Sequence, residues 1–577
     1  MRILIEGEKY PISLLDSILD DPKFYIQKGV FGIINSVGYY HSYEKKELVY
    51  MLPKVFMKEE EETIFGISKT TLYDLETNES FKHKEEFRWI RQLLIYFYNS
   101  LKEYKRRYSD NTIIETSQSF ELNTNLDSHQ YTYLDLLLSF VNFYKKHKTH
   151  ILYQHIEFKS SQLKNPKWEK TIRKTTPIMD AYNAPIYLEV RNKKKIASNE
   201  EELLIYFFSI LKHFDKEHSL NLKIEPIYTL LKGSAFENLQ KTGLSKLRKI
   251  KHRYFSDTLK RMYCLCEIYF QQTDQSSIKR KKEEFISVKN YNMVFEDMVD
   301  KLFSDNLSEK RDVNHESISL DDLKYNNDGK IIDHIYKDTS LLDTSDIFYI
   351  GDSKYYKSNS EAGKLSKYKQ FTYAKNVIQF NIDLLNEGKV YKENIRYRDE
   401  ITEGYNLTPN FFIYGYIEDI NNFDEPNLSI KAAVPVQSYH FKDRLFDRDT
   451  LFVHQYKINF LYVLKSYSNF NESKTIEFRT TVKTKFRYEF IKFFNDPSKS
   501  GFTIYETSIR ETEASELVNA HFKLLNGKCF YTNDGRIIIA VHNSDSTIQD
   551  IIFKNKLTRK LLNSDLLSLK TQKSCTY

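Results

Sequence analysis

Asp333, Asp352 and Lys354 are the residues of this sequence whose types and spacing are best suited to chemistry. Asp352 and Lys354 interrupt an apolar, strand-like run at 347–356, and Asp333 lies in a second such run at 330–337. Side chains alternate across a strand, so Asp352 and Lys354 point to the same face. We expect the two runs to pair, with Asp333 near the middle of its strand and within a few ångströms of Asp352.

A divalent cation explains why two carboxylates would lie so close, because neighbouring carboxylates resist simultaneous ionisation unless a cation lies between them. Magnesium takes oxygen ligands and binds through one or two carboxylates together with a substrate phosphate. The expected Mg²⁺ ligands are Asp333, Asp352 and the backbone carbonyl of Ser353. Lys354 is placed to hold or deprotonate a metal-bound water. The pattern predicts metal-dependent hydrolysis of a phosphodiester bond.

A structural ion pair between Asp352 and Lys354 is the alternative. An acid-x-Lys triplet arises often by chance in a chain with 29% charged residues. The setting favours chemistry, because charges inside an apolar strand are costly unless they are paired or functional. His334 follows Asp333. Strand alternation turns its imidazole away from the metal, so we interpret it as packing.

The elements that must position these residues follow from the periodicity of the flanks. The polar segment 338–346 separates the two runs as a turn. Residues 291–303 place apolar side chains at helical spacing, with Glu296 at the edge of the apolar face. Residues 410–417 read as another apolar strand.

A second helix is predicted at 364–378. Its inward side chains are expected to be Tyr368, Phe371 and Ala374. Its side chains expected to meet phosphates are Lys367, Lys369 and Gln370. Taken singly, either helix is also explained by ordinary packing.

The order of helix, strand, strand, helix and strand resembles the PD-(D/E)XK nuclease core over residues 285–465. The resemblance implies Asp333 and Asp352 as metal ligands, Lys354 as the catalytic lysine, Glu296 as an accessory acid and Gln370 as a polar residue contributed by the following helix. Two positions depart from the motif. Ile332 replaces its proline, and Asp352 stands where glutamate is commoner.

The flanks resemble the LlaJI-type restriction endonucleases, which are relatives of the McrC nuclease subunit. The segments that carry this resemblance are GVFGIINSVGYYHS, ELVYMLPKVF, NPKWEKTI and RLFDRDTLFVHQYKINFLYVL. It implies a prokaryotic restriction system that cuts foreign double-stranded DNA. The implied partners are a separate McrB-like AAA+ GTPase and a cognate DNA methyltransferase. The chain has no G-x-x-x-x-G-K-[ST] motif, so any nucleotide dependence must come from another subunit.

Composition fits this interpretation. A chain of 577 residues with 41% hydrophobic content is expected to form two to four domains. The start lacks an apolar signal core and no run is long enough to span a membrane, so we expect a cytoplasmic protein with no membrane partner. The four cysteines form neither a disulfide framework nor a paired zinc motif, and we interpret Cys264 and Cys266 as buried helix residues.

Net charge is a mild +7, but residues 241–290 hold 13 Lys or Arg against 5 Asp or Glu. Part of this excess lies in a helix expected from about Ala235 to Gln271. A basic stripe there is suited to DNA phosphates, although a solvated helix face explains it equally well. The candidate DNA-binding residues of the stripe are Lys246, Arg248, Lys249, Lys251 and Arg253.

We expect a mixed α+β chain of four parts. These are a β-rich module for DNA recognition or partner docking (1–80), a mainly helical region (81–280), the nuclease core in an α/β arrangement (281–470) and a C-terminal α/β extension (471–577). Within these parts we expect helices at 84–107, 128–147 and 198–214, and a hairpin turning at 533–535.

Three functional classes remain open from sequence. The first is a Mg²⁺-dependent restriction endonuclease subunit that works with a GTPase. The second is a self-sufficient DNA endonuclease. The third is a non-catalytic DNA-binding or scaffold subunit in which the acids and the lysine are structural.

Overall fold

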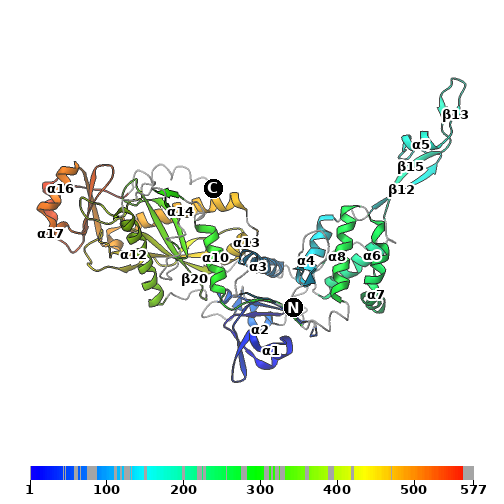
Figure 1. Ribbon diagram of the computed structural model, residues 1–577, viewed down its shortest axis with the longest axis horizontal. Coiled ribbons are helices and arrows are strands. Elements are labelled where there is room, and N and C mark those ends of the chain that lie inside the picture. Colours follow the sequence, from blue (N-terminus) through cyan, green and yellow to red (C-terminus); the bar gives the residue numbers. More distant parts are fainter. Residues whose placement is uncertain are drawn as a thin grey trace.

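The structure is a computed structural model of a mixed α+β chain. It describes residues 2–42, 44–45, 47–57, 63–64, 67–73, 88–108, 114–116, 120–121, 130–131, 133–147, 153–197, 202–217, 222, 224, 229–254, 256–273, 283–304, 311–313, 316–318, 324, 332–357, 363–386, 395–417, 422–469 and 471–562. Figure 1 shows an elongated molecule, with the helical region at one end, the C-terminal extension at the other and the largest sheet between them. No helix among these residues is long and apolar enough to cross a membrane.

The N-terminal module is β-rich, as predicted. Its main sheet has the order β1-β6-β5-β16-β9, in which β16 (Glu283–Val288) comes from after the helical region. A second, three-stranded sheet has the order β2-β4-β3. The elements of the module are β1 (Arg2–Ile5), β2 (Lys9–Pro11), α1 (Ile12–Ile18), η1 (Pro22–Phe24), β3 (Tyr25–Lys28), β4 (Phe31–Ile34), β5 (Val37–Ser42), β6 (Glu47–Leu52), η2 (Lys54–Phe56), β7 (Thr63–Ile64), β8 (Ile67–Ser68) and α2 (Lys69–Leu72).

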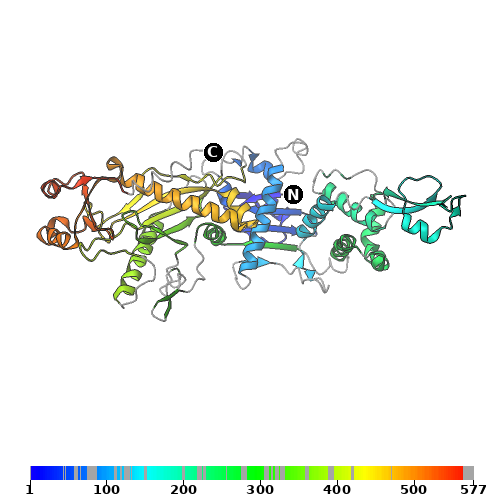
Figure 2. The same cartoon turned by 90° about the horizontal axis from the view of Figure 1, so that it is seen from above.

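The helical region follows, and a small β-arm projects from it in both views (Figures 1 and 2). Its elements are α3 (Arg88–Arg107), β9 (Ile114–Thr116), β10 (Phe120–Glu121), β11 (Gln130–Tyr131), α4 (Tyr133–His147), α6 (Glu202–Glu217), α7 (Ser234–Ile250), η5 (Lys251–Arg253) and α8 (Asp257–Thr273). The arm comprises β12 (Tyr153–Ser160), α5 (Trp168–Lys174), β13 (Ile178–Met179), β14 (Pro185–Ile186) and β15 (Val190–Ala197).

The three helices predicted in this region are confirmed as α3, α4 and α6, with two differences. Residues 130–131 form a strand in place of the start of a helix, and residues 84–87 and 198–201 lie outside the described residues. Cys266 is buried in α8 as expected, whereas Cys264 is exposed.

The single helix expected from Ala235 to Gln271 is wrong, because the chain turns back at η5 and forms two packed helices, α7 and α8. Gly243 permits their close approach, since a Cβ there would lie 2.4 Å from the ring of Phe270. Folding back buries the apolar faces of both halves against each other, which one straight helix cannot do.

The central sheet has the order β19-β20-β21-β24-β22, with β23 also paired to β24. β19 and β20 are antiparallel, and β20, β21 and β24 are mutually parallel neighbours. The elements of this part are α10 (Tyr291–Phe303), β17 (Arg311–Val313), β18 (Glu316–Ile318), β19 (His334–Thr339), β20 (Asp346–Lys354), α12 (Lys364–Asn386), β21 (Pro409–Tyr416), β22 (Ser429–Ile430), β23 (Val436–Ser438), β24 (Leu451–Asn459) and α13 (Phe460–Ser468).

The predicted order of helix, strand, strand, helix and strand is confirmed as α10, β19, β20, α12 and β21. The bounds of the two strands differ from the expected runs. β19 ends at Thr339, two residues later than expected, and β20 ends at Lys354, two residues earlier than expected. Residues 330–331 lie outside the described part of the chain.

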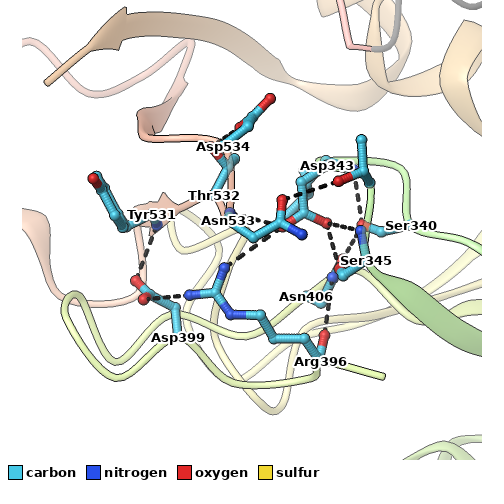
Figure 3. A network of polar contacts seen from close by, with 12 residues as sticks. Ser340, Asp343, Ser345, Arg396, Asp399, Asn406, Tyr531, Thr532, Asn533 and Asp534 are labelled. Atoms are coloured by element: carbon cyan, nitrogen blue, oxygen red, sulfur yellow. Dashed lines mark hydrogen bonds and ion pairs between the residues drawn. The ribbon is translucent and has the colours of Figure 1, made fainter. Parts of the chain in front are cut away.

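The C-terminal extension packs on the turn of the β19–β20 hairpin. Figure 3 shows this contact, in which the Asn533 amide donates a hydrogen bond to Oδ2 of Asp343 in the turn at 3.4 Å. The hairpin predicted to turn at 533–535 is confirmed as β26–β27, and Gly535 adopts φ 81° there. The extension comprises α14 (Glu472–Phe494), α15 (Pro497–Ser500), β25 (Phe502–Ser508), α16 (Glu511–Ala520), α17 (Phe522–Leu525), β26 (Cys529–Tyr531), β27 (Arg536–His542), α18 (Gln549–Lys554) and β28 (Thr558–Arg559).

Candidate active site

Asp333 and Asp352 meet at the open end of the β19–β20 hairpin. The pairing of the strands begins at His334 and Gly351, so Asp333 lies just before β19 and not near the middle of a strand as predicted. Its carboxylate Oδ2 accepts a hydrogen bond from the Ser353 amide at 3.1 Å. The bend frees this carboxylate from the buried ladder and still leaves it beside Asp352.

Burial and neighbouring negative charge together shape the electrostatics at this point. Burial raises the pKa of Asp333 well above its usual range, and the charges of Asp352 and then Glu296 raise it further. The hydrogen bond from the Ser353 amide opposes these effects only in part. The Asp333 carboxyl therefore does not ionise readily without a compensating cation.

Lys354 lies on the same face as Asp352, as the alternation predicted. Its Nζ donates a hydrogen bond to Oδ2 of Asp352 and lies 4.6 Å from the ring centroid of Phe412 on β21. The Asp352 and Lys354 side chains are only 10% and 8% exposed. An amine, a carboxylate and an aromatic face thus share a nearly water-free space.

Glu296 reaches the same place from α10, as its position at the edge of the apolar face predicted. Burial raises its pKa to about 7, a hydrogen bond from Asn292 opposes this shift, and the charge of Asp352 adds to it. The distance from Asn292 Nδ2 to Glu296 Oε1 is 3.3 Å. Near neutral pH this side chain exchanges a proton with little change in free energy, which suits a proton carrier.

His334 packs on the opposite side of the sheet, as predicted. Its Nε2 lies 2.6 Å from Ser353 Oγ, and its Nδ1 lies 3.3 Å from Asp300 Oδ1. Lys324 pairs with the other oxygen of Asp300 at 2.7 Å. Sequence analysis missed this network, although Asp300 follows Glu296 by four residues and so lies on the same side of α10.

Gln370 is fully buried in α12 and does not meet solvent. Its amide nitrogen donates to Asn410 Oδ1 on β21 at 2.5 Å, and its Oε1 has no hydrogen-bond partner in the described part of the chain. The inward direction predicted for Phe371 and Ala374 is confirmed, but Tyr368 is wrong, since it is 66% exposed. Leu365 is also 83% exposed, so this side of the first turns of α12 faces solvent.

The predicted DNA-contacting cations lie at two places. Lys367 is half-buried on α12, and Lys369 is exposed on the same helix, where its charge acts on Glu296. The basic stripe lies on α7 and η5 in the helical region, away from β20 (Figure 1). All five of its residues are exposed, and they are Lys246, Arg248, Lys249, Lys251 and Arg253.

The residues at the hairpin end fit a hard divalent cation by their chemistry. Asp333 and Asp352 supply oxygen donors, and a bound cation would offset the burial and the neighbouring charges that raise the pKa of Asp333. No group of three or more His, Cys, Asp and Glu side chains that could hold a metal occurs in the described ranges. Magnesium binds through as few as one or two carboxylates together with waters, so two aspartates are sufficient.

Comparison with known proteins leaves the family open. No protein-family model matches the chain, and no curated protein matches it. Among solved structures, the chain is similar to one from a refined half-complex of a tetradecameric assembly of Thermococcus gammatolerans McrB AAA+ hexamers with bound McrC. The two share 10% identity with a TM-score of 0.28 over 84% of this chain and 99% of that chain. A likeness this distant assigns neither fold nor function, so the LlaJI resemblance remains a prediction.

Proposed function

We propose that the chain is a Mg²⁺-dependent endodeoxyribonuclease that hydrolyses phosphodiester bonds of foreign DNA. The observation that carries the proposal is the meeting of Asp333 and Asp352 at the hairpin end with Lys354 beside them, in a space that excludes most water. The LlaJI resemblance of the flanks extends the proposal to a restriction subunit that works with a separate McrB-like AAA+ GTPase.

Asp333, Asp352 and the Ser353 carbonyl would hold the Mg²⁺. When bound, the metal supplies an acidified water and offsets negative charge on the phosphate. Lys354 Nζ holds Asp352 Oδ2 and presents an ammonium group to developing charge. Glu296, with its pKa of about 7, takes up or releases a proton at its carboxylate oxygens. The low exposure strengthens each of these interactions, because water screens them little.

The surface cations supply binding without chemistry. Lys369 is exposed on the helix next to the acidic residues, and the α7 stripe offers phosphate contacts at a second place. Contacts of this kind carry no sequence information. The proposal therefore assigns target choice to other parts of the chain or to a partner.

Plasmid cleavage with Mg²⁺ tests the proposal. Wild type is compared with Lys354→Ala and with Lys337→Ala, a matched control that removes an amine from β19 of the same hairpin. The assay is run with and without GTP and the product of a neighbouring GTPase gene. Cleavage that is lost only in Lys354→Ala supports the nuclease. Dependence on the GTPase and GTP supports the two-subunit form, and cutting without them favours a self-sufficient endonuclease.

A chain that binds DNA but never cuts it would contradict the proposal and return Asp333, Asp352 and Lys354 to a structural role. The ion pair between Lys354 and Asp352 would then be a packing feature of β20. Calorimetric titration with Mg²⁺ adds a test without cleavage. Heat of binding in wild type that disappears in Asp333→Asn supports the metal site, and equal heats in both proteins contradict it.

A further inference from the structure

The strand that carries Lys354 is held at its end by the N-terminal module. Tyr355 is the next residue, and its hydroxyl donates a hydrogen bond to Glu6 Oε2. The amide of Lys54 donates to both the Tyr355 hydroxyl and Glu6 Oε2, each at 3.2 Å. Glu6 and Tyr355 are 349 positions apart in the chain. This contact therefore joins the turn directly after β1 to the residue directly after β20.

The Tyr355 ring also touches the helix that carries Glu296. It lies 5.6 Å from the Tyr291 ring and 6.1 Å from the Phe295 ring on α10, measured between centroids. Lys54 Nζ lies 4.7 Å from the same ring. One buried side chain thus contacts the N-terminal module and α10 while it is covalently linked to Lys354.

A second tie lies two residues further along. Lys357 Nζ pairs with Glu8 Oε1 at 2.8 Å, and Lys69 pairs with Glu8 Oε2 at 3.2 Å. Although burial opposes it, these two lysines lower the pKa of Glu8, so the carboxylate is ionised at neutral pH. Both ties come from the same module and hold the segment directly after the candidate catalytic residues.

Movement at Tyr355 is transmitted directly to the site. Tyr355 shares a peptide bond with Lys354, and Phe295 is adjacent to Glu296 on α10. A displacement of the ring therefore moves the catalytic amine and the accessory acid together. Reacting groups misplaced by as little as about 1 Å lose rate by about a hundredfold, so the precision of this anchor matters to chemistry.

We propose that Glu6 and Tyr355 are positioning residues of the nuclease site, which makes the N-terminal module part of the catalytic assembly. This inference rests on the proposed function. Neither residue touches substrate. They fix the direction in which β20 presents Asp352 and Lys354, and they tie that direction to α10. Anything that shifts the module then changes the rate of cleavage more than the affinity for DNA.

Four variants of the full chain test the inference in the plasmid assay. Tyr355→Phe keeps the ring and loses the hydroxyl, and Glu6→Ala removes the acceptor. Both are expected to lower kcat by about ten- to a hundredfold with KM for DNA unchanged. Glu6→Gln keeps an acceptor oxygen and is expected to retain kcat within about threefold. Glu47→Ala is the matched control, since Glu47 pairs with Arg2 in the same module and does not touch β20.

Unchanged kcat in Glu6→Ala and Tyr355→Phe, with wild type active, would overturn the inference and leave the proposed function intact. Wild type that never cuts would overturn the proposed function instead. In that case, hydrogen exchange still tests whether the contact between Glu6 and Tyr355 anchors the end of β20. Faster amide exchange in residues 351–357 of Glu6→Ala than of Glu47→Ala supports it, and equal exchange overturns it.

Discussion

Both ends of the β19–β20 hairpin are buried and carry acidic side chains. These side chains crowd together at the open end and are paired with hydrogen-bond donors at the turn end. At the open end, Asp333, Asp352 and Glu296 crowd together, and the pKa values of Asp333 and Glu296 are raised. At the turn end, Asp343 in the turn and Asp399 in the adjacent segment before β21 are each surrounded by donors (Figure 3). Buried acids thus serve two purposes at the two ends of one hairpin.

At the turn end, the buried carboxylates accept hydrogen bonds from nearby donors. Asp399 is fully buried and accepts from Arg396 at 2.8 Å, from the Tyr531 amide at 2.9 Å and from the Thr402 amide at 3.0 Å. Asp343 accepts from the Ser345 amide at 3.1 Å, and Arg396 lies 3.6 Å from it. These contacts dock the C-terminal extension and leave no charge uncompensated. Repulsion between neighbouring carboxylates, in addition to burial, marks the open end as a candidate site.

The largest difference is expected in activity. Lys354→Ala should lower the cleavage rate by about a hundred- to ten-thousandfold, because it removes a charged group from the reacting centre. Asp343→Asn at the turn end should leave the rate of the folded fraction within a few-fold of wild type. Rates from single-turnover cleavage, corrected for folded protein, check this. Equal losses at both ends would erase the functional distinction.

For the free energy of unfolding, a substitution at the turn end should cost more than one at the open end. Asp399→Asn is expected to lose about 3 kcal/mol in the free energy of unfolding, because it breaks a buried charge pair and leaves Arg396 with only the longer contact to Asp343. Asp333→Asn should be neutral or stabilising at pH 8 without metal. Because its pKa is raised, the Asp333 carboxyl binds its proton more tightly in the folded state than in the unfolded state. Its ionisation above pH 3.8 therefore lowers the stability of wild type, and asparagine avoids this loss because it does not ionise. Urea unfolding in EDTA measures both, and destabilisation of Asp333→Asn would contradict the repulsion at the open end.

The pH dependence sharpens the same contrast. The pKa of Glu296 rises from 4.5 to about 7, so wild type loses stability as pH rises through this window. Glu296→Gln lacks that loss and should gain on the order of 2 kcal/mol over wild type between pH 4.5 and 8. Glu103 gives the opposite sign, because its hydrogen bond with Arg106 lowers its pKa to about 2. Glu103→Gln should instead lose its stabilising contribution above pH 4.5. Unfolding curves across pH test both.

The smallest effect on chemistry is expected far from the hairpin. Reversing Lys249, Lys251 and Arg253 to Glu should weaken DNA binding most at low salt and reduce the salt slope by about three, one for each phosphate contact. Single-turnover cleavage at saturating DNA should not change. Fluorescence anisotropy over a range of salt measures the slope. A slope equal to that of wild type would place the DNA contacts elsewhere.

The elements around the site followed from local patterns, whereas the contacts between distant segments did not. The apolar period that put Glu296 at the edge of α10 depends only on neighbouring residues, as does the alternation of Asp352 and Lys354. The position of Asp333 involves a hydrogen bond from the Ser353 amide, and the close packing of α8 on α7 involves Phe270 reaching Gly243. Glu6 and Tyr355 meet across 349 positions, a contact that no local period encodes.

The strand order of the N-terminal sheet has a consequence for synthesis. β5 lies between β6 and β16, and β16 is translated only after the whole helical region. At usual elongation rates the free edge of β5 waits on the order of tens of seconds for its partner. An unpaired edge strand invites association with other chains. The nascent protein therefore passes through a stage in which the edge of β5 needs protection, by the ribosome or a chaperone, until Glu283–Val288 emerges.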